Sequence, residues 1–465
     1  MAPWVDLPLA TGAGGSRSPF VSDAELVNLM LVPNPAGSPR PFAITDTPGL
    51  LDINIGEGAS LMRGLLSHSD RLWFVKGTGL WYSNGTVETQ VVGGVGSIAG
   101  TARVRMVGTD TDEIVVVADS NTYLATTSTI TAITPPVGTY IDAAWVDGST
   151  VYARSGTDEF YISSIDDPTT IAALDFSTAD GAADRLVGLA VNHRDVILFG
   201  EKHAEFWYNT GAASFPFERA QPGIAERGCF SVGSIAKHGG ATYFLGDDFR
   251  VYSIEGYRPT VVSTPWVDRY IKLSIGLPAN VYSGTYSHDG QSFYILGLGV
   301  AGAIVYDIGG GTWHVRTPAI TAPTFIGVAT RGLDIAIYAA YNSASSYGEL
   351  YKFDHATYRD SDAGGSDTTR TLTCPAIDGG GTRLFESEVE MSMEQVDGGS
   401  PGTVTLKYSD DGGTTYTTHS AQSTNQSRVR WTRCGSFYRR IHRFEFTTNA
   451  RVAVSHVRAR IDRGA

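Results

Sequence analysis

The stretch RLWFVKGTGLWYSNG, residues 71–85, joins two runs of apolar, aromatic and β-branched residues through a glycine turn. Two such runs on either side of a glycine turn predict a β-hairpin. Six further stretches share this pattern and begin at Asp112, Ser149, Arg194, Gly240, Gln291 and Asp334. Their turns are spaced by roughly 37 to 52 residues, the length of one propeller blade. The repeat predicts an all-β chain built on a β-propeller of about seven blades, six to eight being compatible with the spacing.

The repeat leaves both ends of the chain outside the propeller. Residues 1–60 are rich in Pro and Gly, so we expect an extended N-terminal arm, which can wrap a neighbouring subunit or close the ring by supplying an outer strand. Within this arm, the segment SDAELVNLML from Ser22 fits a short capped helix, a short strand or a loop. We expect the propeller over residues 61–358, a polar linker over 359–382, and a C-terminal β-sandwich over 383–465, where the apolar residues alternate with period two.

Charge is unevenly distributed along the chain. The formal net charge is -13, yet residues 428–463 hold ten arginines, no lysine and two acids, a local charge of +8 that leaves about -21 elsewhere. Arginine without lysine suits fixed bidentate contacts, so these residues predict a partner interface; a solvated sheet face is the alternative. Protein fits such an interface better than nucleic acid, because no nucleic-acid module is present. The candidate interface residues are Arg428, Arg430, Arg433, Arg439, Arg440, Arg443, Arg458 and Arg460.

A local motif at residues 409–416, SDDGGTTY, fits the Asp-box hairpin. Sialidases carry several Asp-boxes in their propeller blades, which makes a glycosidase the first enzyme hypothesis. A glycosidase also needs two facing carboxylates, or a Tyr/Glu pair with an arginine cluster. The acids of this chain, Asp166, Asp167, Asp247 and Asp248 among them, mostly stand where turns favour Asp. The motif therefore predicts a structural turn, and we expect no catalytic residues.

Other chemical signals are weak. The ten histidines are scattered without metal-ligand spacing, and no glycine-rich loop precedes a predicted helix, so no metal and no cofactor are expected. Three widely separated cysteines fit reduced thiols. No run is long and apolar enough for a membrane helix, and no secretory signal is visible, so we expect a cytoplasmic site of synthesis.

Three stretches together resemble the tail nozzle (tail hub) proteins of short-tailed bacteriophages, also called packaged-DNA stabilisation proteins. They are AELVNLMLVP from Ala24, RDVILFGEKHAEFWYNTG from Arg194, and RVRWTRCGSFYRRIHRFEFTTNARVAVSHVRARID from Arg428, in the family's order. The resemblance implies a structural virion protein rather than an enzyme.

According to the resemblance, the protein forms a homohexameric tube below the adaptor ring of the portal vertex. The tube retains packaged DNA, anchors tailspikes or tail fibres, is plugged by a tail needle, and opens as the channel for DNA ejection. Double-stranded DNA passes without sequence-specific binding, and the protein belongs to the virion tail after assembly in the host cytoplasm. An acidic body agrees with this role, because repulsion keeps DNA off the wall.

Two alternatives remain open from the residues alone. One is a propeller glycosidase or sialidase-like enzyme, which requires a converging set of carboxylates. The other is a carbohydrate-binding propeller that acts as an adhesin. A propeller by itself does not decide among these roles.

Overall fold

The computed structural model describes residues 2–9, 24–55, 58–181, 184–212, 215–299, 302–320, 323–332, 336–342, 347–354, 356–360, 366–394 and 402–464. Strands dominate these residues. The helical elements among them are the ten-residue α1 (Pro265–Ser274) and the short 3-10 turns η1 (Val232–Ser234) and η2 (Pro278–Asn280). Within this described part, no helix has the length and apolar character needed to cross a membrane.

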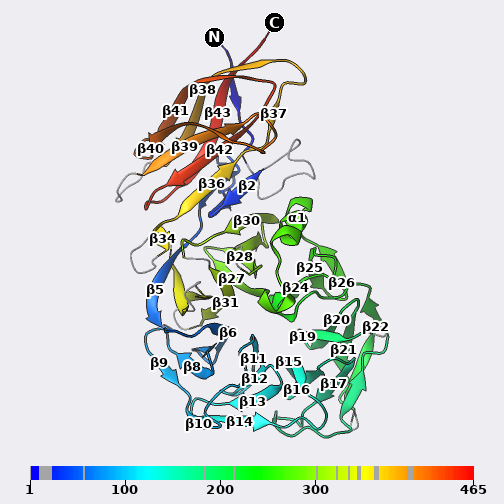
Figure 1. Cartoon of the computed structure of the whole chain (residues 1–465). Coiled ribbons are helices and arrows are strands. Elements are labelled where there is room, and N and C mark those ends of the chain that lie inside the picture. Colours follow the sequence, from blue (N-terminus) through cyan, green and yellow to red (C-terminus); the bar gives the residue numbers. More distant parts are fainter. Residues whose placement is uncertain are drawn as a thin grey trace.

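Seven blades of four antiparallel strands make up the propeller (Figure 1). The strands of each blade are given from inside to outside. Blade 1 contains β6 (Met62–His68), β7 (Arg71–Lys76), β8 (Gly79–Ser83) and β9 (Glu88–Gln90), and blade 2 contains β11 (Val104–Gly108), β12 (Ile114–Ala118), β13 (Asn121–Ala125) and β14 (Thr129–Ile133). Blade 3 contains β15 (Tyr140–Val146), β16 (Ser149–Arg154), β17 (Glu159–Ile162) and β18 (Phe176–Thr178), and blade 4 contains β19 (Leu186–Asn192), β20 (Asp195–Gly200), β21 (Ala204–Asn209) and β22 (Phe217–Ala225). The two-residue β10 (Gly93–Gly94) adds a parallel edge to blade 2.

Blades 5 to 7 follow the same order. They are formed by β23 (Ala236–His238), β24 (Ala241–Leu245), β25 (Val251–Glu255) and β26 (Arg258–Val261); β27 (Tyr282–His288), β28 (Gln291–Gly297), β29 (Ala303–Asp307) and β30 (Thr312–Arg316); β31 (Thr324–Arg331), β32 (Ala336–Asn342), β33 (Gly348–Asp354) and β5 (Gly49–Ile55). The hairpins predicted from the repeat are the second and third strands of each blade. The predicted propeller, with seven blades in the described residues, is therefore confirmed.

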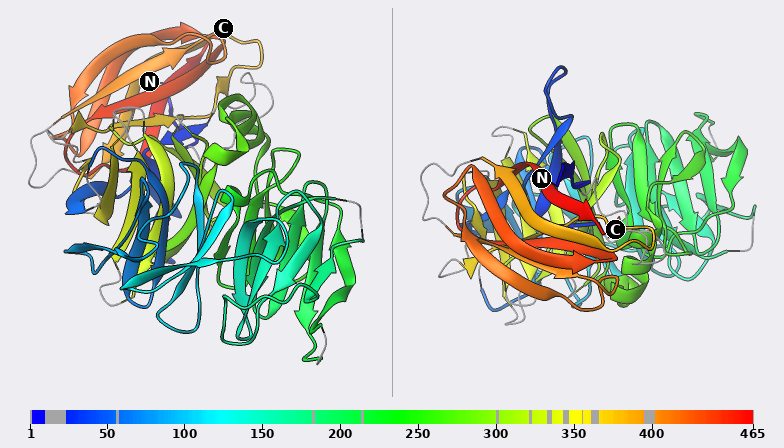
Figure 2. Two further views of the ribbon diagram at one scale, coloured as in Figure 1. Left: turned by 60° about the horizontal axis from the view of Figure 1, so that its bottom comes forward. Right: turned by 90° about the horizontal axis from the view of Figure 1, so that it is seen from above.

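The blades form a closed ring. Each innermost strand contacts the next one, from β6 through β11, β15, β19, β23 and β27 to β31, and β31 lies against β6 again. The views in Figures 1 and 2 show these strands around a common axis. At such contacts glycine permits close approach: a Cβ at Gly64 of β6 would lie 2.7 Å from Cγ2 of Val104 in β11. Closure removes the free sheet edges that an open array would expose.

The N-terminal arm closes the ring, as the sequence allowed. Strand β5 pairs antiparallel with β33, with Gly49 opposite Asp354 and Leu50 opposite Phe353. Asn342 adds a second joint between blades 7 and 1: its Oδ1 accepts from Met62 N at 2.7 Å and its Nδ2 donates to Met62 O at 2.9 Å. The last blade thus combines two segments separated by nearly 300 residues of sequence, so the whole ring must form before this blade is complete.

The propeller's core lies between consecutive blades and is largely aromatic. Phe160 of blade 3 meets Trp207 of blade 4 edge to face, with ring centroids 5.1 Å apart. Phe199 of blade 4 lies 4.9 Å from Phe244 of blade 5. Each apolar cluster joins neighbouring blades, so the hydrophobic effect holds the ring together blade by blade.

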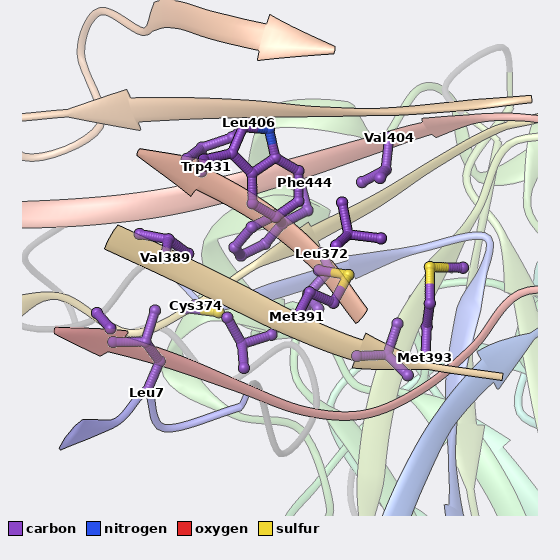
Figure 3. Packing of buried hydrophobic residues seen from close by; sticks show 14 of the residues in the cluster. Leu7, Leu372, Cys374, Val389, Met391, Met393, Val404, Leu406, Trp431 and Phe444 are labelled. Atoms are coloured by element: carbon purple, nitrogen blue, oxygen red, sulfur yellow. The ribbon is translucent and has the colours of Figure 1, made fainter. Parts of the chain in front are cut away.

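A β-sandwich lies above the propeller (Figure 1). One sheet contains β3 (Leu29–Pro33), β4 (Phe42–Asp46), β43 (Ala453–Arg463), β38 (Leu384–Met393) and β41 (Arg428–Phe437), with β1 (Trp4–Asp6) also paired to β43. The other contains β36 (Thr369–Thr373), β42 (Arg439–Thr447), β39 (Thr403–Ser409) and β40 (Thr417–Ser423), with β37 (Ile377–Asp378) at the edge of β42. Figure 3 shows the core between them, in which Trp431 contacts Phe444 at 5.5 Å between ring centroids.

Strands from residues 1–60 and 359–382 belong to both folded units. The segment expected to be helix or strand is β2 (Glu25–Val27) and β3, separated by Asn28 in a left-handed conformation with φ of 53°. Strand β2 lies between β30 of blade 6 and β36 of the sandwich, so one continuous sheet runs through both units. The expected linker contains β34 (Arg359–Asp360), β35 (Ser366–Asp367), β36 and β37. The domain limits themselves stay predictions.

Candidate partner interface

Four of the eight candidate arginines gather on the outer face of the β41–β38–β43 sheet. Arg430 and Arg458 lie directly opposite Glu390 of the central strand, from its two sides, and Arg460 lies opposite Glu388. Arg428 is two residues from Arg430 and therefore shares its face. Directly opposed residues on one face are close enough to pair, so alternation along three strands produces a surface of alternating charge.

Glu390 is the centre of this surface. Its carboxylate accepts from Nη2 of Arg428 at 2.7 Å, Nε of Arg430 at 2.8 Å and Nη2 of Arg458 at 2.6 Å, and its side chain is 1% exposed. Burial favours the neutral acid, but the hydrogen bonds from Arg428 and Arg458 outweigh it and hold the pKa of Glu390 below its ordinary value. The guanidinium groups are therefore held in fixed positions, while Arg428 and Arg430 keep 52% and 49% of their side-chain surface exposed.

Trp4 completes this surface, and sequence reasoning missed it. Strand β1 pairs with β43 so that Trp4 lies opposite Arg460. The guanidinium carbons of Arg458 and Arg460 lie 4.4 and 4.6 Å from the centroid of the Trp4 ring. These distances are typical of cation–π contacts. No signal in the sequence links Trp4 to residues more than 450 positions away. We call Trp4, Glu388, Glu390, Arg428, Arg430, Arg458 and Arg460 the arginine surface.

Arg440 lies inside the sandwich, 2% exposed, and so faces inward rather than toward a partner. Its Nη1 is 3.1 Å from Glu386, and its Nε and Nη2 donate to the two carboxylate oxygens of Asp410 at 2.7 and 2.8 Å. A β-bulge between Glu386 and Glu388 reverses the alternation of β38 and turns Glu386 inward. The bulge is the feature that period-two counting could not predict.

His442 lies beside Arg440 in the same buried cluster. Its Nε2 is 2.9 Å from Oε1 of Glu386, and both side chains are 1% exposed. Burial alone would raise the pKa of Glu386, but His442 and Arg440 together lower it below its ordinary value. Removing His442 or Arg440 would leave the buried carboxylate of Glu386 with less compensation for its lost hydration.

The remaining candidates are dispersed. Arg443 stacks over Tyr416 at 3.8 Å from the ring centroid and donates through Nε to Thr373 Oγ1 at 3.1 Å. Arg433 is exposed within the bulge of β41, with φ of 63°. Arg439 is half-buried and lies opposite Asp378 of β37. The eight arginines therefore do not form a single face, and the arginine surface contains four of them.

The Asp-box is a turn between β39 and β40. Asp411 accepts from the backbone of Thr414 and Thr415, both at 3.0 Å, and Gly412 and Gly413 adopt positive φ. Hydrogen bonds from Thr415 and Ser409 lower the pKa of Asp411 to about 2. Its carboxylate is therefore used within the turn, as the motif predicted.

A cavity of about 600 Å³ lies at one end of the propeller axis, where innermost strands of the blades begin. Arg63 and Arg103 line it, and no aspartate or glutamate is among the lining residues of the described chain. In the same described ranges, no three His, Cys, Asp or Glu side chains come together as a metal site. The pair of facing carboxylates that a glycosidase uses is thus not found in the lining of this cavity.

These features define a seven-bladed β-propeller protein with a sandwich built from both ends of the chain and a charged outer surface. A family model described as "Bacteriophage P22 Gp10, beta-propeller" matches residues 5–318. The chain belongs to this phage stabilisation family, so the resemblance seen in the sequence is confirmed.

Comparison with solved structures finds weaker similarity. A BBS1N chain crystallised in complex with ARL6DN is 12% identical, with a TM-score of 0.43, and the match covers 66% of this chain and 98% of that one. BamB from Moraxella catarrhalis is 10% identical, with a TM-score of 0.38 and coverage of 71% and 98%. The search of curated proteins gave no match. The fold assignment rests on the sheet order and the family match.

Proposed function

We propose that this protein is a structural component of a phage tail: a subunit of a homohexameric nozzle below the portal and its adaptor ring. The observation that carries the proposal is the family match, which spans six of the seven blades and the strands of the N-terminal arm. In this role the protein retains packaged DNA, anchors tailspikes or fibres and a needle, and lines the ejection channel. No catalytic step is part of the proposal.

The charge distribution supports a conduit. About -21 of formal charge lies outside residues 428–463, and an acidic wall repels the DNA backbone instead of binding it. Double-stranded DNA would then pass without sequence-specific contacts. The continuous sheet through β2 supports a rigid wall segment, because it joins blade 6 to the sandwich by backbone hydrogen bonds.

The arginine surface is proposed as the contact with an adaptor or a neighbouring subunit. Four arginines face two glutamates there, so the surface keeps a net positive charge after internal pairing. Guanidinium groups already fixed by Glu390 lose little freedom on binding a carboxylate of a partner. Electrostatic complementarity of this kind affects the association rate and the register of docking.

Assembly tests the proposal. The purified protein is mixed with adaptor rings and weighed by native mass spectrometry, and six copies per ring are expected. The variant Arg428→Gln/Arg430→Gln removes two exposed charges but leaves Glu390 paired with Arg458, so the fold is retained and docking weakens at least tenfold. The matched control, Arg258→Gln/Arg269→Gln, removes two exposed charges from blade 5 and α1 and should dock normally. If the protein remains monomeric in the presence of adaptor rings, the proposal is wrong.

The enzyme and adhesin alternatives have separate readouts. A glycosidase would turn over a chromogenic glycoside or a capsular polymer, and an adhesin would bind a glycan array without turnover. No aspartate or glutamate is among the described lining residues of the axial cavity, so this cavity does not supply the carboxylate pair that a glycosidase uses. Sustained turnover by the purified protein would replace the structural proposal with an enzymatic one.

A further inference from the structure

The axial cavity has a distinctive composition. It is formed where the innermost strands of four blades begin. The residues that line it there are Arg63 in β6, Arg103 just before β11, Tyr282 in β27 and Thr324 in β31. These segments come from blades 1, 2, 6 and 7 and meet only because the ring closes. A cavity of about 600 Å³ is within the size range of small-molecule and side-chain binding sites.

The two arginines of the cavity have different roles. Arg63 is 3% exposed and is saturated by backbone carbonyls. Its guanidinium donates to Ala102 O at 2.6 Å, Ala99 O at 2.9 Å, Gly77 O at 3.0 Å and Ile98 O at 3.2 Å. These bonds hold the loop between blades 1 and 2. Arg63 therefore has a structural role and little capacity left for a ligand.

Arg103 has unused capacity. Its Nη1 donates to Val281 O at 2.5 Å, and its guanidinium carbon lies 4.4 Å from the centroid of the Tyr282 ring. The Nε atom is buried, and no acceptor for it is found in the described part of the chain. Because protein atoms cover Nε, a ligand cannot reach this atom. Nη2 is not among the buried atoms and makes no hydrogen bond in the described part of the chain, so it is the donor that a ligand can use.

No carboxylate neutralises Arg103 within the cavity. Asp142, which acts on it electrostatically, already accepts from Arg105 Nε at 2.9 Å and Leu189 N at 2.8 Å. Burial, and then repulsion by Arg105, lower the pKa of Arg103 to about 9, which still leaves the group charged at neutral pH. A cation of this kind in a cavity without acids favours an anion from outside the chain.

The surroundings of the cavity add an apolar requirement. Leu61, Leu298 and Ile326 line it, and Leu61 keeps 46% of its surface exposed. Apolar side chains in the wall of a cationic pocket suit a ligand that joins one negative group to an apolar body. Inorganic phosphate lacks the apolar body.

We propose that the axial cavity binds a carboxylate carried on an apolar body, with Arg103 as the group that recognises the carboxylate and Leu61 as an apolar contact. The ligand can be a free organic acid or the chain end of a partner protein, because both present the same chemistry. This site is separate from the arginine surface and does not depend on the proposed assembly.

Titration calorimetry with N-acetyl-leucine and its neutral match, N-acetyl-leucinamide, tests the site. We expect the acid to bind at least tenfold more tightly than the amide, and Arg103→Met to abolish that difference. Leu61→Ser, at an exposed position in the cavity wall, should weaken binding of the acid at least threefold. Arg258→Met, a change of the same kind on the exposed outer strand of blade 5, should leave binding unchanged.

Two results would overturn the proposal. Equal affinity for the acid and the amide would show that Arg103 does not recognise the carboxylate. Unchanged binding in Leu61→Ser, together with tighter binding of inorganic phosphate, would show that the site does not require an apolar body. If Arg103→Met does not fold, the acid–amide comparison and Leu61→Ser still decide. Comparison of the affinities for N-acetyl-leucine and hexanoate distinguishes the two kinds of ligand. If N-acetyl-leucine binds more than tenfold more tightly, the site recognises a protein chain end. If the two affinities are equal, it recognises free organic acids.

Discussion

The propeller and the sandwich are stabilised by different interactions. Between blades the contacts are mostly apolar and aromatic, Arg63 is held by backbone carbonyls, and the buried Asp142 pairs with Arg105 of the neighbouring blade. The sandwich also has an apolar core, but it places a three-membered charged cluster of Glu386, Arg440 and His442 in its interior. We therefore expect closure of the apolar ring to dominate the stability of the propeller, and the buried charged cluster to add a pairing requirement to the sandwich.

Removing the buried cation should affect the sandwich most. Arg440→Met leaves Glu386 and Asp410 without their guanidinium partner, and breaking a buried pair costs about 3–5 kcal/mol. Urea unfolding followed by Trp431 fluorescence measures the loss. Arg428→Met, at a side chain that is 52% exposed, should cost less than about 1 kcal/mol. A similar loss in the free energy of unfolding in the two variants would show that the buried ion pair stabilises the sandwich no more than the exposed one.

Weakening the apolar contact of β5 that closes the ring tests the stability of the propeller. Leu50 in β5 is fully buried between blades, and Leu50→Ala should reduce the free energy of unfolding by about 2–5 kcal/mol. Its neighbour Leu51 is 37% exposed, so Leu51→Ala should cost about 0.5 kcal/mol or less. Hydrogen exchange should show loosening of β33 and β31 in the first variant. Equal effects of the two changes would contradict closure through β5.

Acid should weaken the sandwich through its paired glutamates. The pKa of Glu390 is lowered from 4.5 in the folded protein, so its stabilising contribution is complete above about pH 5 and is lost as pH falls through the folded pKa. The stability gap between the wild type and Glu390→Gln should be about 1.5–3 kcal/mol at pH 7 and should narrow as pH falls from 4.5 through the lowered folded-state pKa. Glu394→Gln, in an exposed pair with Arg451, should show a gap below about 1 kcal/mol. A gap for Glu390 that is independent of pH would refute this account.

The smallest effect concerns the edge of the arginine surface. Trp4→Ala removes two cation–π contacts and should lower the stability of the sandwich by about 1 kcal/mol. Val5→Ala, in the same strand but 43% exposed, is the control. Thermal unfolding distinguishes them, and a larger loss for Val5 would mean that the strand, rather than the ring of Trp4, holds this edge.

Much of the fold could be predicted from the sequence. The turn near Gly77 and its six counterparts identify the central hairpin of each blade, because alternation and glycine turns are local properties. The ten-residue segment from Ser22 was ambiguous for the same reason: a short segment fits a helix, a strand or a loop, and only pairing of β2 with β30 and β36 decides between them. Of the candidate interface, alternation groups Arg428 with Arg430, and Arg458 with Arg460. Only the pairing of β41 and β43 with β38 brings the two pairs onto one face.

What the sequence alone determined is the propeller, the period-two sandwich strands, the Asp-box turn and the charged C-terminal segment, because each depends on residues close together in the chain. The tertiary structure decided that β5 closes the ring, that Trp4 joins Arg458 and Arg460, and that Glu386 turns inward to meet Arg440. It also placed Arg103 in a cavity without acids. These outcomes depend on pairings across long sequence separations and on a single β-bulge in β38, which reverses the side-chain alternation beyond it.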